Sequence, residues 1–257
     1  MNSITIAIQC HNFQKRLSLM LSSILAQEQK EMYNLIIDVA HYSQNGIPST
    51  EKVINYFKSK NLNIISRSYK DYDRFKYRGF TRNDQIINCS TNYILFADSD
   101  MIYHNEFFHK LMSLLKEDDQ YKNYEGIMTC GRWSQNNNLI ENTNIFVDNL
   151  IDKDPIYIEN IWYLSDSKLD KVKRRNCGAG FFQLINMDLC EHENFYVNED
   201  KCRDYNWDTK GQKAKSDQQF KRRIGLKKKL PGWYSKSQIH LNHFRDSMVG
   251  KHIETQR

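Results

Sequence analysis

Short apolar runs recur along the first half of the chain at intervals that suit buried strands. They occupy residues 4–9 (ITIAIQ), 35–39 (LIIDV), 63–66 (NIIS) and 93–97 (YILFA). Runs of four to eight apolar residues bounded by polar segments are typical of strands buried on both faces. The pattern therefore predicts four strands in the first hundred residues.

The segments between these runs have apolar residues three and four positions apart, which is the spacing of an amphipathic helix. Candidate N-terminal caps are Asn12, Asn105, and Thr81 with Asp84 as a capping box, and a further helix is expected over about 50–60. The expected apolar faces are formed by Leu17, Met20, Leu21, Ile24 and Leu25, by Val53, Ile54 and Phe57, and by Phe108, Leu111, Met112 and Leu115.

Alternation of strands and helices predicts a parallel sheet with helices on both faces. Ligands of such sheets bind outside the carboxyl ends of the strands. Three segments that follow predicted strands are then expected to gather at one edge, namely 11–12, 41–46 and 98–100.

The pattern becomes irregular after about residue 125, where strands are expected near 126–130, 180–186 and 238–244. We therefore predict a single α/β domain over 1–257. Its first half, 1–125, is expected to be a Rossmann-like nucleotide-binding half, and 126–257 a mixed half that binds the acceptor and completes the site.

Composition places the chain among globular proteins of a reducing compartment. With 40% hydrophobic residues, its 257 residues can form a substantial core. No apolar run approaches the roughly 20 residues of a membrane span, and the N-terminus lacks the basic and apolar regions of a secretory signal. The six cysteines form no Cys-x-x-Cys pair, so we expect free thiols and a cytoplasmic location.

The formal charge of +6 suggests an anionic partner, and the basic residues concentrate in 171–175 and 221–229. A nucleotide diphosphate, an acidic glycan or peripheral contact with a membrane surface would each satisfy this charge. No nucleic-acid-binding motif is present, so nucleic acid is not an expected partner. Solvated faces of helices and loops remain the simpler explanation.

Asp98-Ser99-Asp100 is the first chemical signal. It follows directly on the apolar run 93–97 and so lies at the end of a buried strand. A divalent metal held by carboxylates can neutralise a departing diphosphate without a proton donor. One carboxylate of the pair would bind the metal, and the other the ribose or a metal-bound water. The alternative is a pair of solvated turn residues, which the preceding buried run disfavours.

A second signal is the pair His240 and His243 within the expected strand 238–244. Neutral histidines are good ligands for divalent metals. Strand alternation places His243 on the face of Ile239 and Leu241, so a histidine of the core is an open alternative.

Asp217 follows Ser216 in a helix-capping pattern, downstream of Trp207. It is either a first-turn residue that complements the helix dipole or a general base that deprotonates an acceptor hydroxyl. The glycines of 177–180 (CGAG) permit close approach of the backbone to a ligand, and a tight turn is the alternative.

In their order along the chain, these segments resemble GT-A glycosyltransferases of family 2, and the end of the chain is similar to the C-terminal part of the β-1,4-galactosyltransferases. The resemblance rests on Arg82-Asn83, 96–102 (FADSDMI), 178–181 (GAGF), 216–220 (SDQQF) with Arg222 or Arg223, and 243–246 (HFRD). The chain departs from the family pattern at Ser216, where Glu is usual, and at 9–12, where the family has a proline-containing segment.

The resemblance implies an inverting transfer of a hexose or N-acetylhexosamine from a UDP-sugar to a glycan hydroxyl, as in polysaccharide biosynthesis. Mn2+ or Mg2+ would be held by Asp100, His243 and His240. Asp217 would be the base. Donor contacts would come from Asp98, Asp38, Arg82 and Asn12, and acceptor contacts from Gly178, Ala179, Gly180 and Trp207.

Two other functions remain open from the sequence. One is a basic, non-catalytic protein that binds glycans or nucleotides. The other is a nucleotidyltransferase, although the Gly-rich, basic loop expected after its first strand is absent from 9–16.

Overall fold

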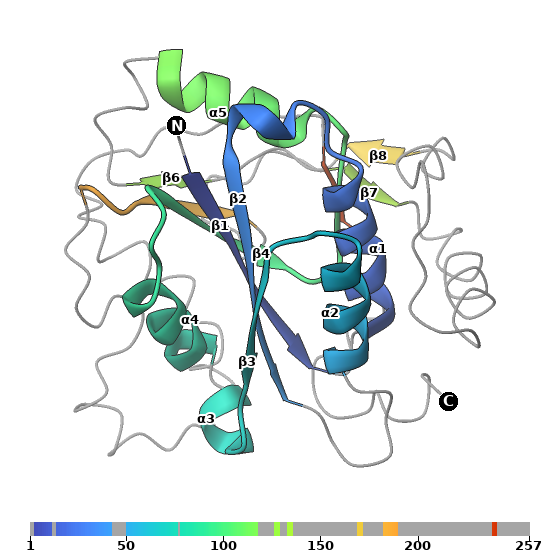
Figure 1. Cartoon of the computed structure of the whole chain (residues 1–257), viewed down its shortest axis with the longest axis vertical. Helices are drawn as coiled ribbons and strands as arrows, with labels where there is room; N and C mark the ends of the chain where they lie inside the picture. Colours follow the sequence, from blue (N-terminus) through green and yellow to red (C-terminus); the bar gives the residue numbers. More distant parts are fainter. Residues whose placement is uncertain are drawn as a thin grey trace.

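The computed structural model describes residues 3–11, 14–42, 50–76, 78–117, 126–128, 133–135, 169–171, 182–189 and 238–240. Within these residues the strands form a six-stranded sheet and a four-stranded sheet, with helices packed around the larger one (Figure 1). No helix in this part of the chain is long and apolar enough to span a bilayer.

The large sheet is built around β1 (Ser3–His11), which pairs in parallel with β2 (Asn34–Tyr42) and β4 (Tyr93–Asp98). β3 (Ile64–Ser68) extends the parallel part beyond β2. On the other side, β9 (Gln183–Asn186) is antiparallel to β4, and β6 (Gly126–Met128) is antiparallel to β9. The parallel sheet predicted for the first half of the chain is confirmed.

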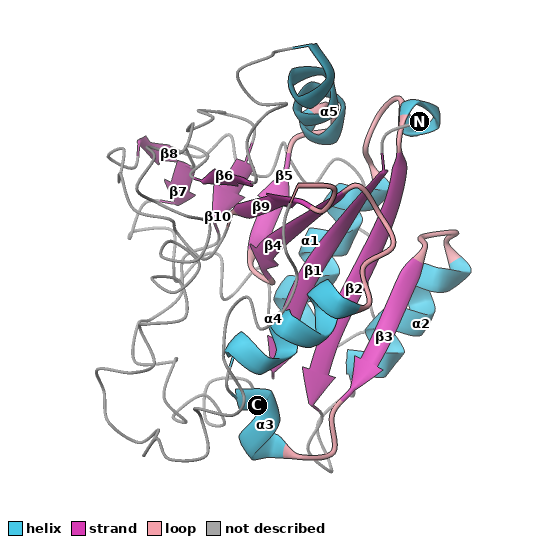
Figure 2. Cartoon of the chain, turned by 90° about the vertical axis from the view of Figure 1, so that its left-hand side faces the viewer, coloured by secondary structure: helices cyan, strands magenta, loops and turns pink. Residues whose placement is uncertain are grey.

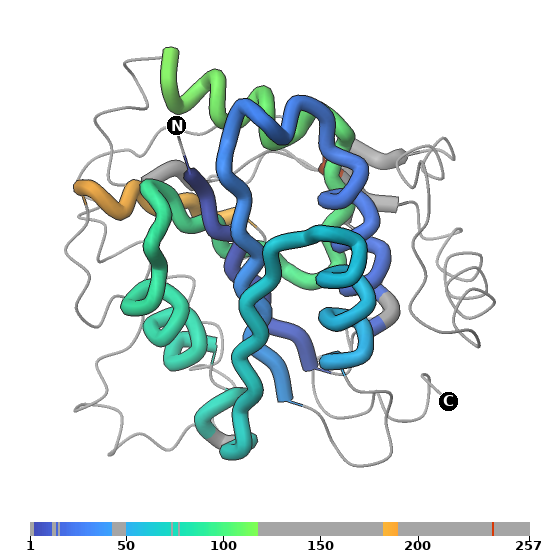
Figure 3. Tube along the Cα trace, viewed as in Figure 1, coloured from blue at the N-terminus to red at the C-terminus, as the bar shows by residue number. Residues whose placement is uncertain are grey.

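Helices cover both faces of this sheet (Figure 2). α1 (Gln14–Leu25) and α2 (Thr50–Ser59) lie on one face, and α4 (Arg78–Ile87) lies on the opposite face, preceded by the short α3 (Tyr72–Lys76). Within the described residues, the remaining helices are α5 (Phe107–Glu117), light green in Figure 3, and a 3-10 turn, η1 (Lys30–Met32).

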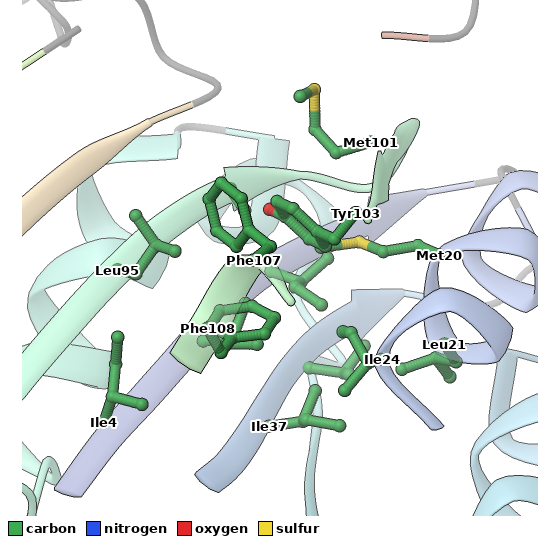
Figure 4. Packing of buried hydrophobic residues seen from close by; sticks show 14 of the residues in the cluster. Ile4, Met20, Leu21, Ile24, Ile37, Leu95, Met101, Tyr103, Phe107 and Phe108 are labelled. Atoms are coloured by element: carbon green, nitrogen blue, oxygen red, sulfur yellow. The ribbon is translucent and has the colours of Figure 1, made fainter. Parts of the chain in front are cut away.

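The main core lies on the face covered by α1 and α2. Successive residues of a strand point to opposite faces, so the even-numbered residues of β1 contribute to this core. α5 adds two phenylalanines whose rings contact each other and Tyr103. Figure 4 shows the packing of Ile4, Met20, Leu21, Ile24, Ile37, Leu95, Met101, Tyr103, Phe107 and Phe108.

Two predicted helix caps are wrong. α4 begins at Arg78, so Thr81 lies inside the helix, where its hydroxyl donates a hydrogen bond to the carbonyl of Arg78 (3.0 Å). At α5 the free N–H of Phe108 is satisfied by the side-chain carbonyl of Gln27 (3.1 Å), and Asn105 instead donates to Glu28. Gln27 lies just after the end of α1, far from α5 in the sequence. The spacing of residues near α5 therefore could not predict this contact.

The small sheet joins segments that are far apart in the sequence. Its order is β5-β10-β7-β8, with β5 (Met101–Tyr103), β10 (Gln238–His240), β7 (Trp133–Gln135) and β8 (Leu169–Lys171). β5 follows Asp100 directly, and β10 pairs with it in the antiparallel direction. The late part of the chain therefore returns to the position of the paired aspartates.

Candidate functional site

The carboxyl ends of β1, β2 and β4 meet at one edge of the large sheet. Asp98 of β4 is in register with Gln9 of β1, and His11 at the end of β1 is in register with Tyr42 at the end of β2. The expected gathering of these strand ends is confirmed for His11, 41–42 and 98–100. Residues 12 and 43–46 of the same loops lie outside the described part.

The side chains at these strand ends point to the face covered by α3 and α4. Phe96, two residues before Asp98 on the same face, lies beneath the guanidinium of Arg82 in α4 (5.2 Å to the ring centre). Gln9 donates a hydrogen bond to the carbonyl of Phe75 in α3. The candidate site is therefore bounded by the ends of three strands and by α3 and α4.

The two aspartates of the motif have different surroundings. The Asp98 side chain is 25% exposed, and its Oδ1 lies 3.2 Å from Nη1 of Arg78, the first residue of α4. Asp100 is 4% exposed, in the turn between β4 and β5. Asp98 is thus accessible at the sheet edge, whereas Asp100 is buried in the turn between two strands.

β10 brings a second predicted metal ligand, His240, to this turn. His240 is in register with Met101, the residue that follows Asp100. Paired residues of antiparallel strands have Cα atoms roughly 4.5–5.5 Å apart. Oxygen ligands from aspartate and a nitrogen ligand from histidine together suit Mn2+. Within the described residues no group of three His, Cys, Asp or Glu side chains is assembled, and the side chain of His240 and all of His243 lie outside them.

An aromatic cluster lies beside the motif, formed by His11, Tyr42, Tyr72 and Phe75. The ring centres of His11 and Tyr72 are 5.2 Å apart, and those of Tyr42 and Tyr72 are 5.1 Å apart. Phe75 is the buried member of the cluster, and its ring stacks on that of Tyr42 with 6.0 Å between the ring centres. Tyr72 is 40% exposed. Burial lowers the pKa of His11, so its ring is neutral at pH 7. The cluster offers an aromatic surface for a flat ligand at the sheet edge.

The surroundings of Asp38 favour a structural role over contact with a donor. Asp38 is buried inside β2, and both its carboxylate oxygens accept hydrogen bonds from Nε of Arg67 (2.8 and 2.7 Å). The amide of Gln85 in α4 donates to the backbone carbonyl of Asp38 (2.9 Å). Burial raises the pKa of Asp38, against the opposing effect of Arg67. Through its carboxylate Asp38 ties β2 to β3, and through its backbone carbonyl it ties β2 to α4.

Arg82 is also enclosed by the protein. It is 4% exposed, and its Nη1 donates to the side-chain carbonyl of Gln183 in β9 (2.8 Å). Together with its position over Phe96, this contact links α4 to the antiparallel part of the sheet. The contribution to donor binding that is expected of Arg82 would then be indirect, through the position of α4.

Several predicted site residues lie outside the described part of the chain. They are Asn12, Gly178, Ala179, Gly180, Trp207, Asp217 and His243. Their assignments stay predictions.

Comparison with known protein families and with curated protein sequences gives no match. Solved structures do match. S. aureus TarS 1-349 in complex with UDP-GlcNAc has a TM-score of 0.62 and 12% identity, over 97% of this chain and 61% of that one. The mannosyltransferase PcManGT from Pyrobaculum calidifontis, in complex with GDP-Man and Mn2+, has a TM-score of 0.52 and 8% identity.

The chain has the GT-A fold. The match with PcManGT covers 98% of this chain and 59% of PcManGT. The chain therefore spans about three fifths of the length of these two structures. At such low identity the likeness establishes the fold.

The hydrophobic and motif patterns of the sequence did not predict Arg78 or the aromatic cluster as parts of the site. A local signal exists, because aromatic and basic residues alternate through 69–80 (YKDYDRFKYRGF) directly before the predicted helix. α3 has too few residues to show a helical period, so the segment gave no reason to place these rings at the strand ends.

Acid is expected to destabilise the fold through His41. Its ring is buried, with Nε2 2.9 Å from the hydroxyl of Ser66, and burial lowers its pKa below the ordinary value of 6.5. The unfolded chain therefore takes up a proton first as the pH falls through 6.5, and stability decreases there. Each such histidine contributes a slope of at most about 1.4 kcal/mol per pH unit.

Urea unfolding at pH 7.5, 6.5 and 5.5 measures this effect. His41→Gln should reduce the dependence of the unfolding free energy on pH by up to the contribution of one proton, about 1.4 kcal/mol per pH unit. This holds whatever the effect of the substitution on stability at pH 7.5. An identical pH slope in the variant would contradict the assignment.

Proposed function

We propose that the protein is a metal-dependent glycosyltransferase that moves a hexose or N-acetylhexosamine from a UDP-sugar to a glycan hydroxyl. The observation that carries the proposal is the convergence of three features at one sheet edge. These are the paired aspartates at the end of β4, the aromatic cluster at the ends of β1 and β2, and β10 beside β5, the strand that follows Asp100. The bound UDP-GlcNAc of TarS and the GDP-Man and Mn2+ of PcManGT support this class of donor.

In this proposal Asp100, His240 and His243 hold the divalent metal. The ion, Mn2+ or Mg2+, supplies positive charge that stabilises the departing diphosphate. The turn between β4 and β5 places the backbone of Asp100, and the pairing of β10 with β5 places the backbone of His240 beside it. The chain can thus present an oxygen and a nitrogen ligand with little loss of conformational entropy.

The nucleoside would bind at the aromatic cluster. A uracil ring can stack on Tyr72, the exposed member, while Asp98 accepts a hydrogen bond from a ribose hydroxyl. Asn12, directly after β1, is a further donor contact in this arrangement. Asp38 and Arg82 would act indirectly, because each holds α4 against the sheet.

On the acceptor side, Asp217 would remove the proton from the attacking hydroxyl, which implies inversion at the anomeric carbon. Gly178, Ala179, Gly180 and Trp207 would line the path of the acceptor. This part of the proposal rests on the resemblance to family 2 and on the order of the motifs along the chain.

Tyr72→Ala is expected to weaken UDP binding roughly 5- to 150-fold, since loss of one base–aromatic stack costs about 1–3 kcal/mol. The substitution is mild for the fold because the side chain is 40% exposed. Tyr56→Ala is the matched control, since Tyr56 lies in α2 on the opposite face of the sheet. Calorimetric titration with UDP and Mn2+ gives both affinities. Equal affinities in the two variants would remove the aromatic cluster from the nucleotide site.

Titration of the wild-type protein with UDP in the presence and absence of Mn2+ tests the proposed function as a whole. Saturable binding that requires Mn2+, with slow release of UDP from a UDP-sugar, is the expected result. Binding without any turnover would instead indicate a non-catalytic protein. Release of pyrophosphate from UTP and a sugar 1-phosphate would indicate a nucleotidyltransferase.

A further inference from the structure

Arg78 contacts the metal motif from the helix on the opposite side of the site. Its Nη1 lies 3.2 Å from Oδ1 of Asp98, and the two side chains are 39% and 25% exposed. The pair therefore stands at the accessible edge of the site, while Asp100 is buried behind it. Ion pairs this exposed are weak, so Arg78 can change partner at small cost.

The position of Arg78 favours an anion as that partner. It is the first residue of α4, whose first turn contains no acidic side chain. The partial positive charge of a helix N-terminus adds to that of the guanidinium, and this combination attracts phosphate. A guanidinium can also bind two phosphate oxygens at once, so a diphosphate can compete with the contact to Asp98.

The same charge opposes a metal ion that arrives alone. A divalent cation at Asp100 would be repelled by the guanidinium of Arg78, which already neutralises Asp98 in the same motif. When a nucleoside diphosphate arrives with the metal, its negative charge removes that conflict. The cation and the diphosphate then assist each other's binding.

We propose that Arg78 passes from Asp98 to the diphosphate of the donor, so that metal and nucleoside diphosphate bind as a pair. This inference rests on the proposed function and makes Arg78 a positioning and specificity residue for the diphosphate. In this proposal Arg78 binds the diphosphate, and the aromatic cluster binds the nucleoside.

The chain offers a matched control in Arg74. Its Nη2 lies 3.0 Å from Oδ1 of Asp84, and these side chains are 38% and 27% exposed. Arg74→Gln removes the same charge from an equally exposed ion pair four residues away, and it leaves the contact between Arg78 and Asp98 in place. At position 78 itself, Arg78→Gln removes the charge. Arg78→Lys is a second variant, which keeps the charge but loses the planar, two-point donor.

The experiment compares Mn2+ alone, UDP with Mn2+, and uridine as ligands of the wild type and the three variants. Arg78→Gln should bind Mn2+ alone at least about threefold more tightly and UDP with Mn2+ at least about tenfold more weakly. Its uridine affinity should stay within about twofold of wild type, because uridine carries no phosphate. Arg74→Gln should match wild type throughout, and Arg78→Lys should lose less UDP affinity than Arg78→Gln.

Equal UDP affinity in Arg78→Gln and Arg74→Gln would overturn this inference alone. Parallel losses of uridine and UDP affinity in Arg78→Gln would also overturn it, since Arg78 would then only support the fold of the site. A wild-type protein that binds no UDP with Mn2+ would overturn the proposed function, and this inference with it. Thermal unfolding of each variant shows that the compared proteins are folded.

Discussion

Replacement of Asp217 by asparagine is expected to slow sugar transfer at least about a hundredfold, because a missing general base removes roughly 10²–10⁴-fold of rate. The base acts in the transition state, so the affinities for Mn2+ and UDP should stay at the wild-type level. Asparagine keeps the size of the side chain and still serves near a helix N-terminus. The loss of stability should therefore be below about 1 kcal/mol.

The matched control is Asp208→Asn, which makes the same change upstream in the same half of the chain. Single-turnover transfer rates with both substrates saturating separate the two variants. Turnover of Asp217→Asn within a few fold of wild type would return Asp217 to the role of a first-turn residue. A slow Asp208→Asn with a normal Asp217→Asn would move the base to Asp208.

Asp100→Asn is expected to remove Mn2+-dependent binding of UDP. The substitution keeps the shape of a side chain that is 4% exposed, but it takes the negative charge from the turn between β4 and β5. Loss of an outer partner of a metal ligand already costs roughly 10–100-fold in metal affinity, so loss of a ligand should cost at least about a hundredfold. Metal-independent binding of uridine should persist, because the aromatic cluster is unchanged.

Ser99→Ala is the control for Asp100→Asn, since Ser99 occupies the same turn and is similarly buried at 8% exposure. It should bind Mn2+ and UDP like the wild type. Calorimetric titration of both variants with UDP at saturating Mn2+ makes the comparison. Unchanged affinity in Asp100→Asn would contradict the assignment of the metal site.

The parallel half of the fold could be predicted because its elements have a clear period. The apolar run 93–97 is buried on both faces and ends at Asp98 in the structure, as expected. The helix predicted over about 50–60 is α2, with Val53, Ile54 and Phe57 buried. Such elements follow from local hydrophobic pattern, and their parallel order follows from the alternation of strands and helices.

Features that depend on distant partners could not be predicted in the same way. β5 and β10 have three residues each, which is too short for a period. Their pairing brings His240 from a distant part of the sequence to Met101, next to the turn that contains Asp100. The resemblance to family 2 implied that Asp38 contacts the donor. Only the structure shows Arg67 arriving from β3 to engage both its oxygens.

The candidate site shows the same division. The position of Asp98 and Asp100 at the sheet edge was predictable, because buried strands of a parallel sheet end there. The ion pair of Asp98 with Arg78 and the stacking of Tyr42 on Phe75 arise from the fold of α3 and α4 over that edge. Spacing in the sequence does not encode such contacts between elements.

Turnover of nucleotide sugars in the presence of Mn2+ tests the central claim most directly. The wild type and Asp100→Asn are incubated with a panel of UDP- and GDP-sugars, and the released nucleoside diphosphate is measured with and without EDTA. We predict that the wild type releases UDP from at least one UDP-sugar, that EDTA stops the release, and that Asp100→Asn shows none. Absence of release from every donor, or release that continues in EDTA or in Asp100→Asn, would contradict a metal-dependent glycosyltransferase.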